Sequence, residues 1–367
     1  MQLNHILFTG ESGFLYRYRF LVESIAQHVE RVDSIGTSNF PDNRFLKELI
    51  ELYRKPIYKL STRLGERLFY KNKRIFIETS QRTERKIRQL EHKPDLILHI
   101  FAMSIPLWDS SDIPYAMYLD YTMALIIKNW QRWAPFPIQQ KAWLDCERRA
   151  YQNAHHLFVM SQLVKTSLIE DYGVAPEQIT VTGGAANFEQ LYEGEKPFGS
   201  KQILFNGSDF KRKGGKLVLA AFRKVRAAIP DAKLVIIGKK MWIREPGVVV
   251  LGNVASRSEL QQLFVSSDVV LAPSYCDPFP TFLLEAFNHG VPCVVPNRDG
   301  MPEIVSHDVD GVVVQELTDE AIANALIQLL QNPEQLSAMS QAARKKVRER
   351  FNWDDIATTM IDVLKAK

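Results

Sequence analysis

Two carboxylates, Asp277 and Glu285, stand eight residues apart in the stretch Leu271 to Val305. This stretch predicts a buried strand ending at Pro273, a loop, a helix that carries Glu285 and a second strand. If the segment between the carboxylates were helical throughout, it would rise about 12 Å. That separation suits neither a two-carboxylate hydrolase nor a single metal site. It suits the two ends of an elongated ligand with vicinal diols, although a capping aspartate and an exposed glutamate give the same spacing.

A second polar group follows the first strand predicted for the same half of the chain. The segment Phe205 to Gly215 reads FNGSDFKRKGG, and it places Arg212 and Lys213 among glycines that include Gly207. A flexible loop, cationic side chains and the N-terminus of the next helix can together bind a diphosphate. The alternative is a solvated basic turn. The position after a strand, in the same half as the carboxylate pair, favours the diphosphate site.

Together these residues resemble the retaining glycosyltransferases with two facing Rossmann-like domains, the GT-B fold, and within them glycosyltransferase family 4, the glycosyl transferases group 1. The resemblance covers nearly the whole chain. In that family a Glu-x7-Glu motif follows a strand that ends in Pro-Ser. Here Pro273 and Ser274 precede Asp277, and Ala286 follows Glu285 as in the family's Glu-Ala. Many members have Asp-Pro-Phe-Pro at the first position, as this chain does at 277–280.

The resemblance implies a role for each part of this motif. Glu285 is expected to bind the ribose hydroxyls of a nucleotide sugar. Asp277 and the neighbouring backbone are expected to contact the donor sugar. The family's Gly-Gly-x-x-Glu turn is matched by the residues from Asp299 to Glu303. The further donor contacts expected from the resemblance are, in chain order, Val254, Phe279, Pro280 and Thr281.

The phosphate motif departs from the family pattern at one position. Ser208 stands where the family has an arginine directly after glycine, whereas the lysine before the Gly-rich end is present as Lys213. Arg212, next to it, is our candidate for the missing charge. The resemblance implies that these cations stabilise the leaving diphosphate, so that no metal ion and no cofactor beyond the donor is required. Lys213 and Asp277 are therefore expected to be catalytic.

The first half of the chain carries the expected acceptor side of the site. The loop from Gly10 to Gly13 lies where the family's Gly-rich loop approaches donor and acceptor, although an ordinary strand-to-helix turn has the same composition. Asp120 follows a predicted strand, where related enzymes often place a polar residue near the reacting sugar, and it is our third catalytic candidate. His155 and His156 open a buried strand, and we expect them to be structural.

These residues must be positioned by parallel α/β sheets, because short apolar runs alternate with helical patterns along most of the chain. Helices are expected over 217–228, 257–266, 282–288, 319–331 and 333–351, and long polar helical patterns over 44–90. The expected strands are His5 to Thr9, Val32 to Gly36, Asp95 to Ile100, Tyr115 to Leu119, His156 to Met160, Ile179 to Thr182, Gln202 to Phe205, Lys233 to Ile237, Val248 to Leu251, Val269 to Ala272, Cys293 to Val295 and Gly311 to Val314.

The length of 367 residues supports two domains with full cores, and the composition is that of a globular protein. We predict an acceptor-binding Rossmann-like domain over 1–190, a linker over 191–201, a nucleotide-sugar-binding Rossmann-like domain over 202–351 and an interdomain cleft. The amphipathic segment 352–367 is expected to return to the first domain. Three dispersed cysteines indicate neither a disulfide framework nor a zinc site. Neither a secretion signal nor a membrane-spanning segment is expected.

Two surface features bear on the acceptor. Residues 44–93 hold 15 Lys or Arg against six Asp or Glu. They could attract an anionic membrane surface, with long solvated helices as the alternative. No nucleic-acid motif accompanies this charge. Aromatic side chains gather around Asp120 and suit a saccharide acceptor, although core packing explains several of them. They are Tyr115, Tyr118, Tyr121, Trp130, Trp133, Phe136 and Trp143.

The favoured function is a retaining transfer of a sugar from a nucleoside diphosphate sugar, of UDP or GDP type, to a saccharide or lipid-linked saccharide. We expect it in the cytoplasm, with contact to the inner face of the cytoplasmic membrane as an option. Two alternatives remain open. The same fold hosts nucleotide-sugar epimerases, and Ser208 in place of arginine also fits a non-catalytic nucleotide-sugar-binding partner of a glycosyltransferase. Fold alone does not decide among these functions.

Overall fold

The computed structural model describes residues 3–37, 48, 51–52, 55–57, 62–188 and 190–366. Residues 44–47, 49–50, 53–54 and 58–61 of the predicted basic region therefore lie outside the described residues, as does Lys367 at the end of the C-terminal segment. The chain forms two units. The first contains residues 1–183 and 353–367, and the second contains residues 184–352.

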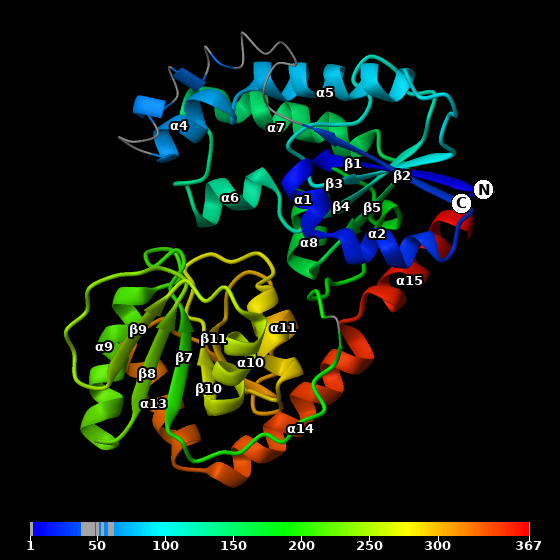
Figure 1. The fold of residues 1–367 in the computed structure, drawn as a ribbon. Coiled ribbons are helices and arrows are strands. Elements are labelled where there is room, and N and C mark those ends of the chain that lie inside the picture. Colours follow the sequence, from blue (N-terminus) through cyan, green and yellow to red (C-terminus); the bar gives the residue numbers. More distant parts are fainter. Residues whose placement is uncertain are drawn as a thin grey trace. The chain divides into compact units, whose positions relative to one another are not determined.

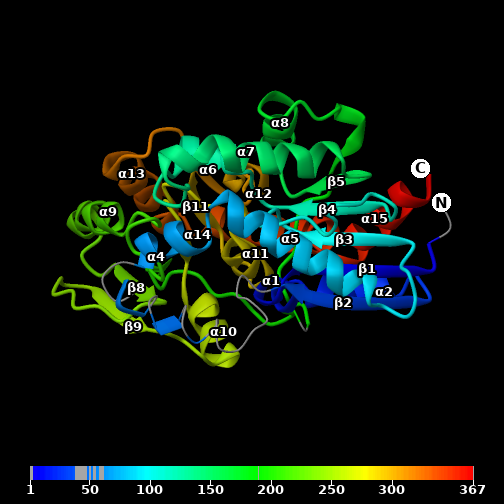
Figure 2. The same ribbon diagram turned by 90° about the horizontal axis from the view of Figure 1, so that it is seen from above.

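The first unit is built on a parallel sheet of six strands, in the order β2-β1-β3-β4-β5-β6. Figure 2 shows β2, β1, β3, β4 and β5 side by side in that order. The strands are β1 (His5–Glu11), β2 (Arg31–Thr37), β3 (Leu96–Ile100), β4 (Tyr115–Leu119), β5 (His156–Val159) and β6 (Ile179–Val181). β3, β4 and β5 are buried along their whole length, as expected for parallel strands that helices cover on both faces.

Helices flank the first sheet. α5 packs against α7 on one face and α2 packs against α15 on the other (Figure 1). The helices are α1 (Ser12–Arg17), α2 (Arg19–Ala26), α4 (Thr62–Phe69), α5 (Lys73–Arg88), α6 (Met123–Asn129), α7 (Pro137–Gln152), α8 (Gln162–Glu170) and α15 (Trp353–Ala366), with a short 3-10 helix at Pro176–Gln178. Trp353 of α15 makes edge contacts with Tyr18 and Tyr118. The last helix of the chain therefore completes the first unit.

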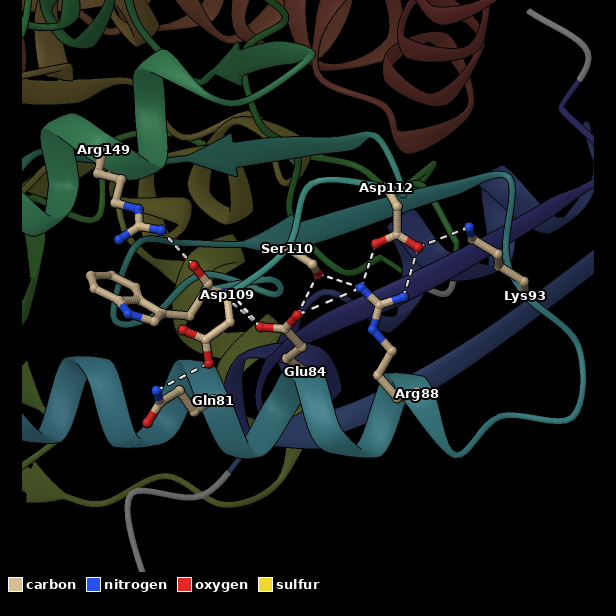
Figure 3. Close-up of polar contacts among 9 residues, drawn as sticks. Gln81, Glu84, Arg88, Lys93, Asp109, Ser110, Asp112 and Arg149 are labelled. Atoms are coloured by element: carbon tan, nitrogen blue, oxygen red, sulfur yellow. Dashed lines mark hydrogen bonds and ion pairs between the residues drawn. The ribbon is translucent and has the colours of Figure 1, made fainter.

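The loop after β3 is tied to α5 by a polar network (Figure 3). Glu84 of α5 accepts the backbone N–H groups of Trp108 and Asp109, both at 2.7 Å. Arg88, one turn further on, donates to Asp112, which also accepts from Lys93 at 2.9 Å. Burial alone would raise the pKa of Glu84, but these hydrogen bonds and one from Ser110 outweigh it and lower the pKa. The network holds α5 in place from its middle to its C-terminal end.

The second unit repeats the plan with a parallel sheet in the order β12-β11-β10-β7-β8-β9. Its strands are β7 (Gln202–Asn206), β8 (Lys233–Ile237), β9 (Val248–Gly252), β10 (Val269–Leu271), β11 (Cys293–Pro296) and β12 (Gly311–Val314). Its helices are α9 (Gly215–Ala228), α10 (Arg257–Ser266), α11 (Thr281–Asn288), α12 (Met301–Ile304), α13 (Asp319–Leu330) and α14 (Pro333–Arg350). Side chains of β7, β8, α9 and α13 contribute to an apolar core that includes Phe205, Phe222 and Leu326.

The segment 191–201, predicted as a linker, lies against the second unit. The N–H of Tyr192 donates to Asn288, and Lys196 donates to the carbonyl of Val265 at 3.1 Å. The buried carboxylate of Asp268 accepts two backbone N–H groups, that of Gly199, which is shared between both oxygens, and that of Lys201. The absence of a periodic pattern in this segment is therefore compatible with a fixed, hydrogen-bonded course.

In the described part of the chain, no helix has both the length and the apolar character that crossing a bilayer requires. The three cysteines, Cys146, Cys276 and Cys293, are buried free thiols.

Candidate functional site

The strand order of the second sheet brings the two sequence motifs to one place. β7 lies between β10 and β8, so the order reverses at the β7–β10 pair. In doubly wound sheets, ligands bind beyond the carboxyl ends of the strands at such a point. The loop after β7 contains 207–214, and the loop after β10 contains 272–280. Both motifs therefore occupy the position at which this type of sheet binds ligands.

The two loops touch through their backbones at Gly214. This residue is the N-cap of α9 and has a left-handed φ of 78°. A Cβ atom there would collide with the carbonyl oxygen of Pro273. Gly207 is buried, and its N–H donates to Ile237 at 2.8 Å, whereas Ser208 is exposed. Glycine at 214 is therefore required both by the turn and by the close approach of the second loop.

The charged side chains of the two loops converge on Asp277. Its Oδ2 atom lies 3.0 Å from Arg212 Nη1 and 3.2 Å from Lys213 Nζ. The three side chains are only 11 to 13% exposed. Arg212 Nη1 also donates to the carbonyl of Cys276 at 2.7 Å, and buried Ser274 donates to Asp277. The three residues singled out from the sequence thus form one compact cluster with two positive charges and one negative charge.

The backbone of Asp277 is fixed by the turn that matches the family's Gly-Gly-x-x-Glu motif. The N–H of Asp277 donates to Asp299 Oδ2 at 2.7 Å. Asp299 itself has a left-handed φ of 49°. The N–H of Gly300 donates to the carbonyl of Pro278 at 3.1 Å. This turn therefore sets the position of the loop that carries Asp277.

Asp277 and Glu285 do not share a continuous helix. α11 begins at Thr281, with Pro280 as its N-cap. Asp277 therefore lies in the preceding loop, and the helical rise between the two carboxylates does not apply. The physical reason is the pair of prolines, Pro278 and Pro280, which disfavour helical backbone in the residues before them. Phe279, between the prolines, is buried at 9% exposure.

Glu285 is half-buried on α11. Burial raises its pKa to about 7, and the positive charges of Arg257 and Lys213 partly oppose this. Arg257, at the first position of α10, did not stand out in the sequence, because a single basic residue at a helix start has no pattern around it. Val254 is half-buried in the loop between β9 and α10, three residues before Arg257. The site thus contains a carboxylate that changes charge near neutral pH.

In the first unit, the order reverses at the β1–β3 pair. Gly10 was predicted in the loop after the first strand, but it lies within β1, which extends to Glu11. Its φ is 150°, and an added Cβ atom would lie 2.9 Å from the carbonyl oxygen of Ile100. Gly13 was predicted in a loop, but it lies in α1, and an added Cβ would meet nothing within 4 Å. Asp120 follows β4 and is half-buried. Burial raises the pKa of Tyr18 and Tyr118, and the charge of Asp120 raises them further.

The aromatic residues around Asp120 divide into two groups. Four are core residues: Tyr115, Tyr118, Tyr121 and Trp143 are each at most 8% exposed. The other three, Trp130, Trp133 and Phe136, are half-exposed. His156 is buried, as expected for a structural residue, and lies 2.8 Å from the hydroxyl of Thr180.

Residues 188–346 match the family described as Glycosyl transferases group 1. A relative, the uncharacterized glycosyltransferase MJ1607 of Methanocaldococcus jannaschii, is 33% identical over 177 residues, 45% of each chain. The match covers about half the length of this relative and of another, N-acetyl-alpha-D-glucosaminyl L-malate synthase of Bacillus anthracis. Among solved structures, WaaG, a glycosyltransferase involved in lipopolysaccharide biosynthesis, has a TM-score of 0.65 at 13% identity, over 99% of this chain and 100% of WaaG. Anabaena HepE with UDP and glucose has a TM-score of 0.62 at 15% identity and full coverage of both chains. The predicted GT-B fold is confirmed.

Proposed function

We infer that residues 188–346 of this chain belong to Glycosyl transferases group 1. From this premise we propose that the protein transfers a sugar from a nucleoside diphosphate sugar to an acceptor, with retention of anomeric configuration. The acceptor is a saccharide or a lipid-linked saccharide. The donor is a UDP or GDP sugar, and a structural neighbour that holds UDP and glucose supports this class of donor. The first unit takes the acceptor, and the second unit takes the donor.

One observation carries the proposal most directly, namely the convergence of Arg212, Lys213 and Asp277 at the reversal of strand order in the second sheet. α9, with 14 residues, begins directly after the loop that carries both cations. Its N-terminus and the two side chains supply positive charge for the leaving diphosphate. The proposed reaction therefore uses no metal ion.

The two carboxylates have separate roles. Glu285, when ionised, accepts hydrogen bonds from both ribose hydroxyls. Asp277 faces the cations in the free protein, so the incoming diphosphate meets cations that already have a partner. We assign Asp277 to orienting these cations and the donor sugar. The mechanism is front-face transfer through an ion-pair-like state, in which no carboxylate acts as a covalent nucleophile.

Thermal unfolding with UDP, GDP, ADP and dTDP sugars tests the proposal first. A ligand at 100 times its dissociation constant adds about 2.7 kcal/mol to the free energy of unfolding. A stabilising donor is then incubated with candidate acceptors, and the product's anomeric configuration is determined. Free epimerised nucleotide sugar without acceptor would favour an epimerase instead. Tight donor binding with neither transfer nor hydrolysis would favour a non-catalytic binding partner, and stabilisation by none of the donors would contradict all three.

A further inference from the structure

The first unit has a cavity of about 660 Å³ outside the candidate site residues. It is bordered by α4, by the first turns of α5 and by the start of α7. α5 leads toward β3 and α7 leads into β5, so both helices begin on the carboxyl side of the sheet. This volume lies within the range of roughly 300–1,000 Å³ that small-molecule sites occupy.

The wall of the cavity combines positive charge with apolar surface. Arg67, Lys73 and Arg74 line it, and among its described residues only Glu78 carries a negative charge. Lys73 is exposed, and Arg74, with 83% of its side chain exposed, pairs with Glu78 at 2.6 Å. The apolar part of the wall comes from Leu68, Ile77 and Phe136.

Arg67 is held at this wall by hydrogen bonds and a ring contact. Its guanidinium donates to the carbonyls of Ala134 (2.8 Å) and Gln131. It also lies over the ring of Phe136, 5.5 Å from the centroid. A guanidinium fixed in this way offers its charge with little loss of side-chain entropy on binding a ligand.

The charges at the start of α5 run against the usual preference of helices. Helix N-termini favour acidic side chains, because the helix dipole is positive there. The first turn of α5 contains no acidic residue and instead contains Lys73 and Arg74. The pair Arg74–Glu78 also has the less favourable order for an i,i+4 ion pair. The first turn of α7 has no acidic residue either. Two helix N-termini and three cations therefore meet at one cavity, an arrangement that a bound anion would stabilise.

The far end of α5 keeps this arrangement in place. Glu84 and Arg88 anchor the helix to the loop after β3 (Figure 3). The first turn of α5 is thus presented by a helix that is fixed elsewhere along its length.

We propose that this cavity binds the phosphate group of a phosphorylated acceptor, with the cations on the phosphate and the apolar wall on the rest of the molecule. The identification of the ligand as the acceptor rests on the proposed function, whereas phosphate binding at the cavity does not. The ligand is thus a phosphate monoester. It is either a soluble sugar phosphate or a lipid phosphate.

Isothermal titration calorimetry with two phosphate monoesters tests the proposal and separates the sources. Glucose 6-phosphate represents the soluble source, and dioctanoyl phosphatidic acid below its micellar concentration represents the lipid source. Glucose is the uncharged control. At least one ester should bind the wild-type protein, more weakly as salt is added. The ester that binds more tightly identifies the ligand as a soluble sugar phosphate or as a lipid phosphate. If neither ester binds at millimolar concentration, the proposal is wrong.

The double variant Lys73→Gln/Arg74→Gln should lower the affinity for that ester about tenfold or more, because it removes two of the three cations that line the cavity. The matched variant Arg85→Gln/Lys86→Gln removes two charges from the other end of α5, outside the cavity, and should leave the affinity unchanged. Equal losses in the two variants, or no loss in the first, would overturn the assignment.

Two further readouts distinguish binding from a structural role. Without phosphate, Lys73→Gln/Arg74→Gln should have a Tm at or above that of the wild type. The reason is that it removes two positive charges from the first turn of α5, where the helix dipole is also positive. A clear drop in Tm would show that the cations serve stability. The affinity of this variant for nucleoside diphosphates should equal that of the wild type. In transfer assays with a phosphorylated acceptor, its KM for the acceptor should rise while kcat and the KM for the donor stay unchanged. If no nucleoside diphosphate binds but the ester does, the proposed function fails while the phosphate site stands.

Discussion

Lys213 and Arg212 both approach the Asp277 carboxylate, but only Lys213 occupies the position of the family lysine. If both stabilise charge that grows on the leaving diphosphate, their removal should lower kcat more than it weakens donor binding. We expect Lys213→Ala to lower kcat by about 10²- to 10³-fold, and Arg212→Ala to lower it less. Steady-state kinetics with a donor found by the stability screen measures both effects.

Lys224 provides the control for this pair. It is an exposed cation in the C-terminal half of the same helix, α9, where it pairs with Asp319 and Glu320. Lys224→Ala should leave kcat unchanged. An arginine introduced by Ser208→Arg into the Arg212→Ala variant should restore turnover if Arg212 replaces the family's arginine. Wild-type kinetics for Arg212→Ala would end that assignment.

Glu285 gives donor binding a dependence on pH. Its pKa is raised to about 7 by burial, so the carboxylate that accepts the ribose hydroxyls is fully present only above neutral pH. Nucleoside diphosphate affinity should therefore rise between about pH 6 and pH 8. Glu285→Gln should weaken binding by about 1.5–3 kcal/mol at pH 8 and remove the contribution of this group to the pH dependence. An unchanged affinity would contradict the ribose role.

The same group affects the stability of the free protein. The folded state retains the proton of Glu285 up to about pH 7, whereas in the unfolded chain it leaves near the ordinary pKa of 4.5. Between these values the folded state binds more protons, so this group makes the free energy of unfolding fall as pH rises. Thermal unfolding of wild type and Glu285→Gln across pH 4 to 8 should show a smaller fall in the variant.

At the residue level, the sequence identified the charged residues of the cluster but not their contacts. Lys213, Arg212 and Asp277 stood out through their spacing and motifs. The two cations converge on one oxygen of Asp277 because of the backbone conformation of the loops. Gly214 and Asp299 have a positive φ there, and the residue pattern of the sequence does not specify these angles. The prolines at 278 and 280 could have indicated that Asp277 precedes α11.

Among the helices and strands, the start of α9 is the element most closely tied to function. Gly214→Ala adds a Cβ that collides with Pro273 and strains a positive φ. The loop after β7, residues 207–214, should move away from the loop after β10. Nucleoside diphosphate affinity should then fall about tenfold or more, as expected for the loss of one charged contact. Gly173→Ala is the control, since its φ is 69° but its nearest atom is 3.6 Å away. A similar loss of affinity in both variants would point to general destabilisation.

The start of α6 depends on a buried carboxylate. Glu147 is 3% exposed and accepts the N–H of Met123 at 3.1 Å, the indole N–H of Trp143 at 3.2 Å and the hydroxyl of Tyr172. Burial raises its pKa to about 7, and these hydrogen bonds partly oppose the shift. Glu147→Ala leaves buried donors without an acceptor, at about 1–3 kcal/mol each.

We therefore expect Glu147→Ala to lower the free energy of unfolding by at least about 2 kcal/mol in urea titrations. Glu147→Gln, which keeps one carbonyl oxygen, should lower it less. Exposed Glu170 on α8 is the control, and Glu170→Ala should have little effect. Equal stability of Glu147→Ala and wild type would show that the network contributes nothing.

The strands were predicted from the sequence more completely than the helices. All twelve predicted strands are present, since buried parallel strands such as β4 and β8 appear as short apolar runs between turns. Six α-helices of the described residues were not predicted: α1, α2, α6, α7, α8 and α12. α1, α6 and α12 have seven residues or fewer, too few turns to establish a helical period. That reason does not apply to α7, which has 16 residues. The cavity beside α4 and α5 could not be predicted either, because it arises from the packing of three helices.

For the whole molecule, we expect the C-terminal helix α15 to stabilise the first unit. It packs against α2, and Ser24 donates to Asp354 at 2.6 Å. Removal of 353–367 exposes the buried faces of Tyr18 and Tyr118 that contact Trp353. Thermal unfolding of this truncated chain should show a lower Tm for the first unit and an unchanged transition for the second. Limited proteolysis that cleaves residues 184–352 first would contradict this.

The return of the chain through α15 has a consequence for synthesis on the ribosome. The second unit is one uninterrupted segment, 184–352, whereas the first needs residues from both ends of the chain. The nascent first unit therefore cannot bury the aromatic rings of Tyr18 and Tyr118 against Trp353 until translation has passed residue 353. The unit that is translated first is thus the one whose folding finishes last.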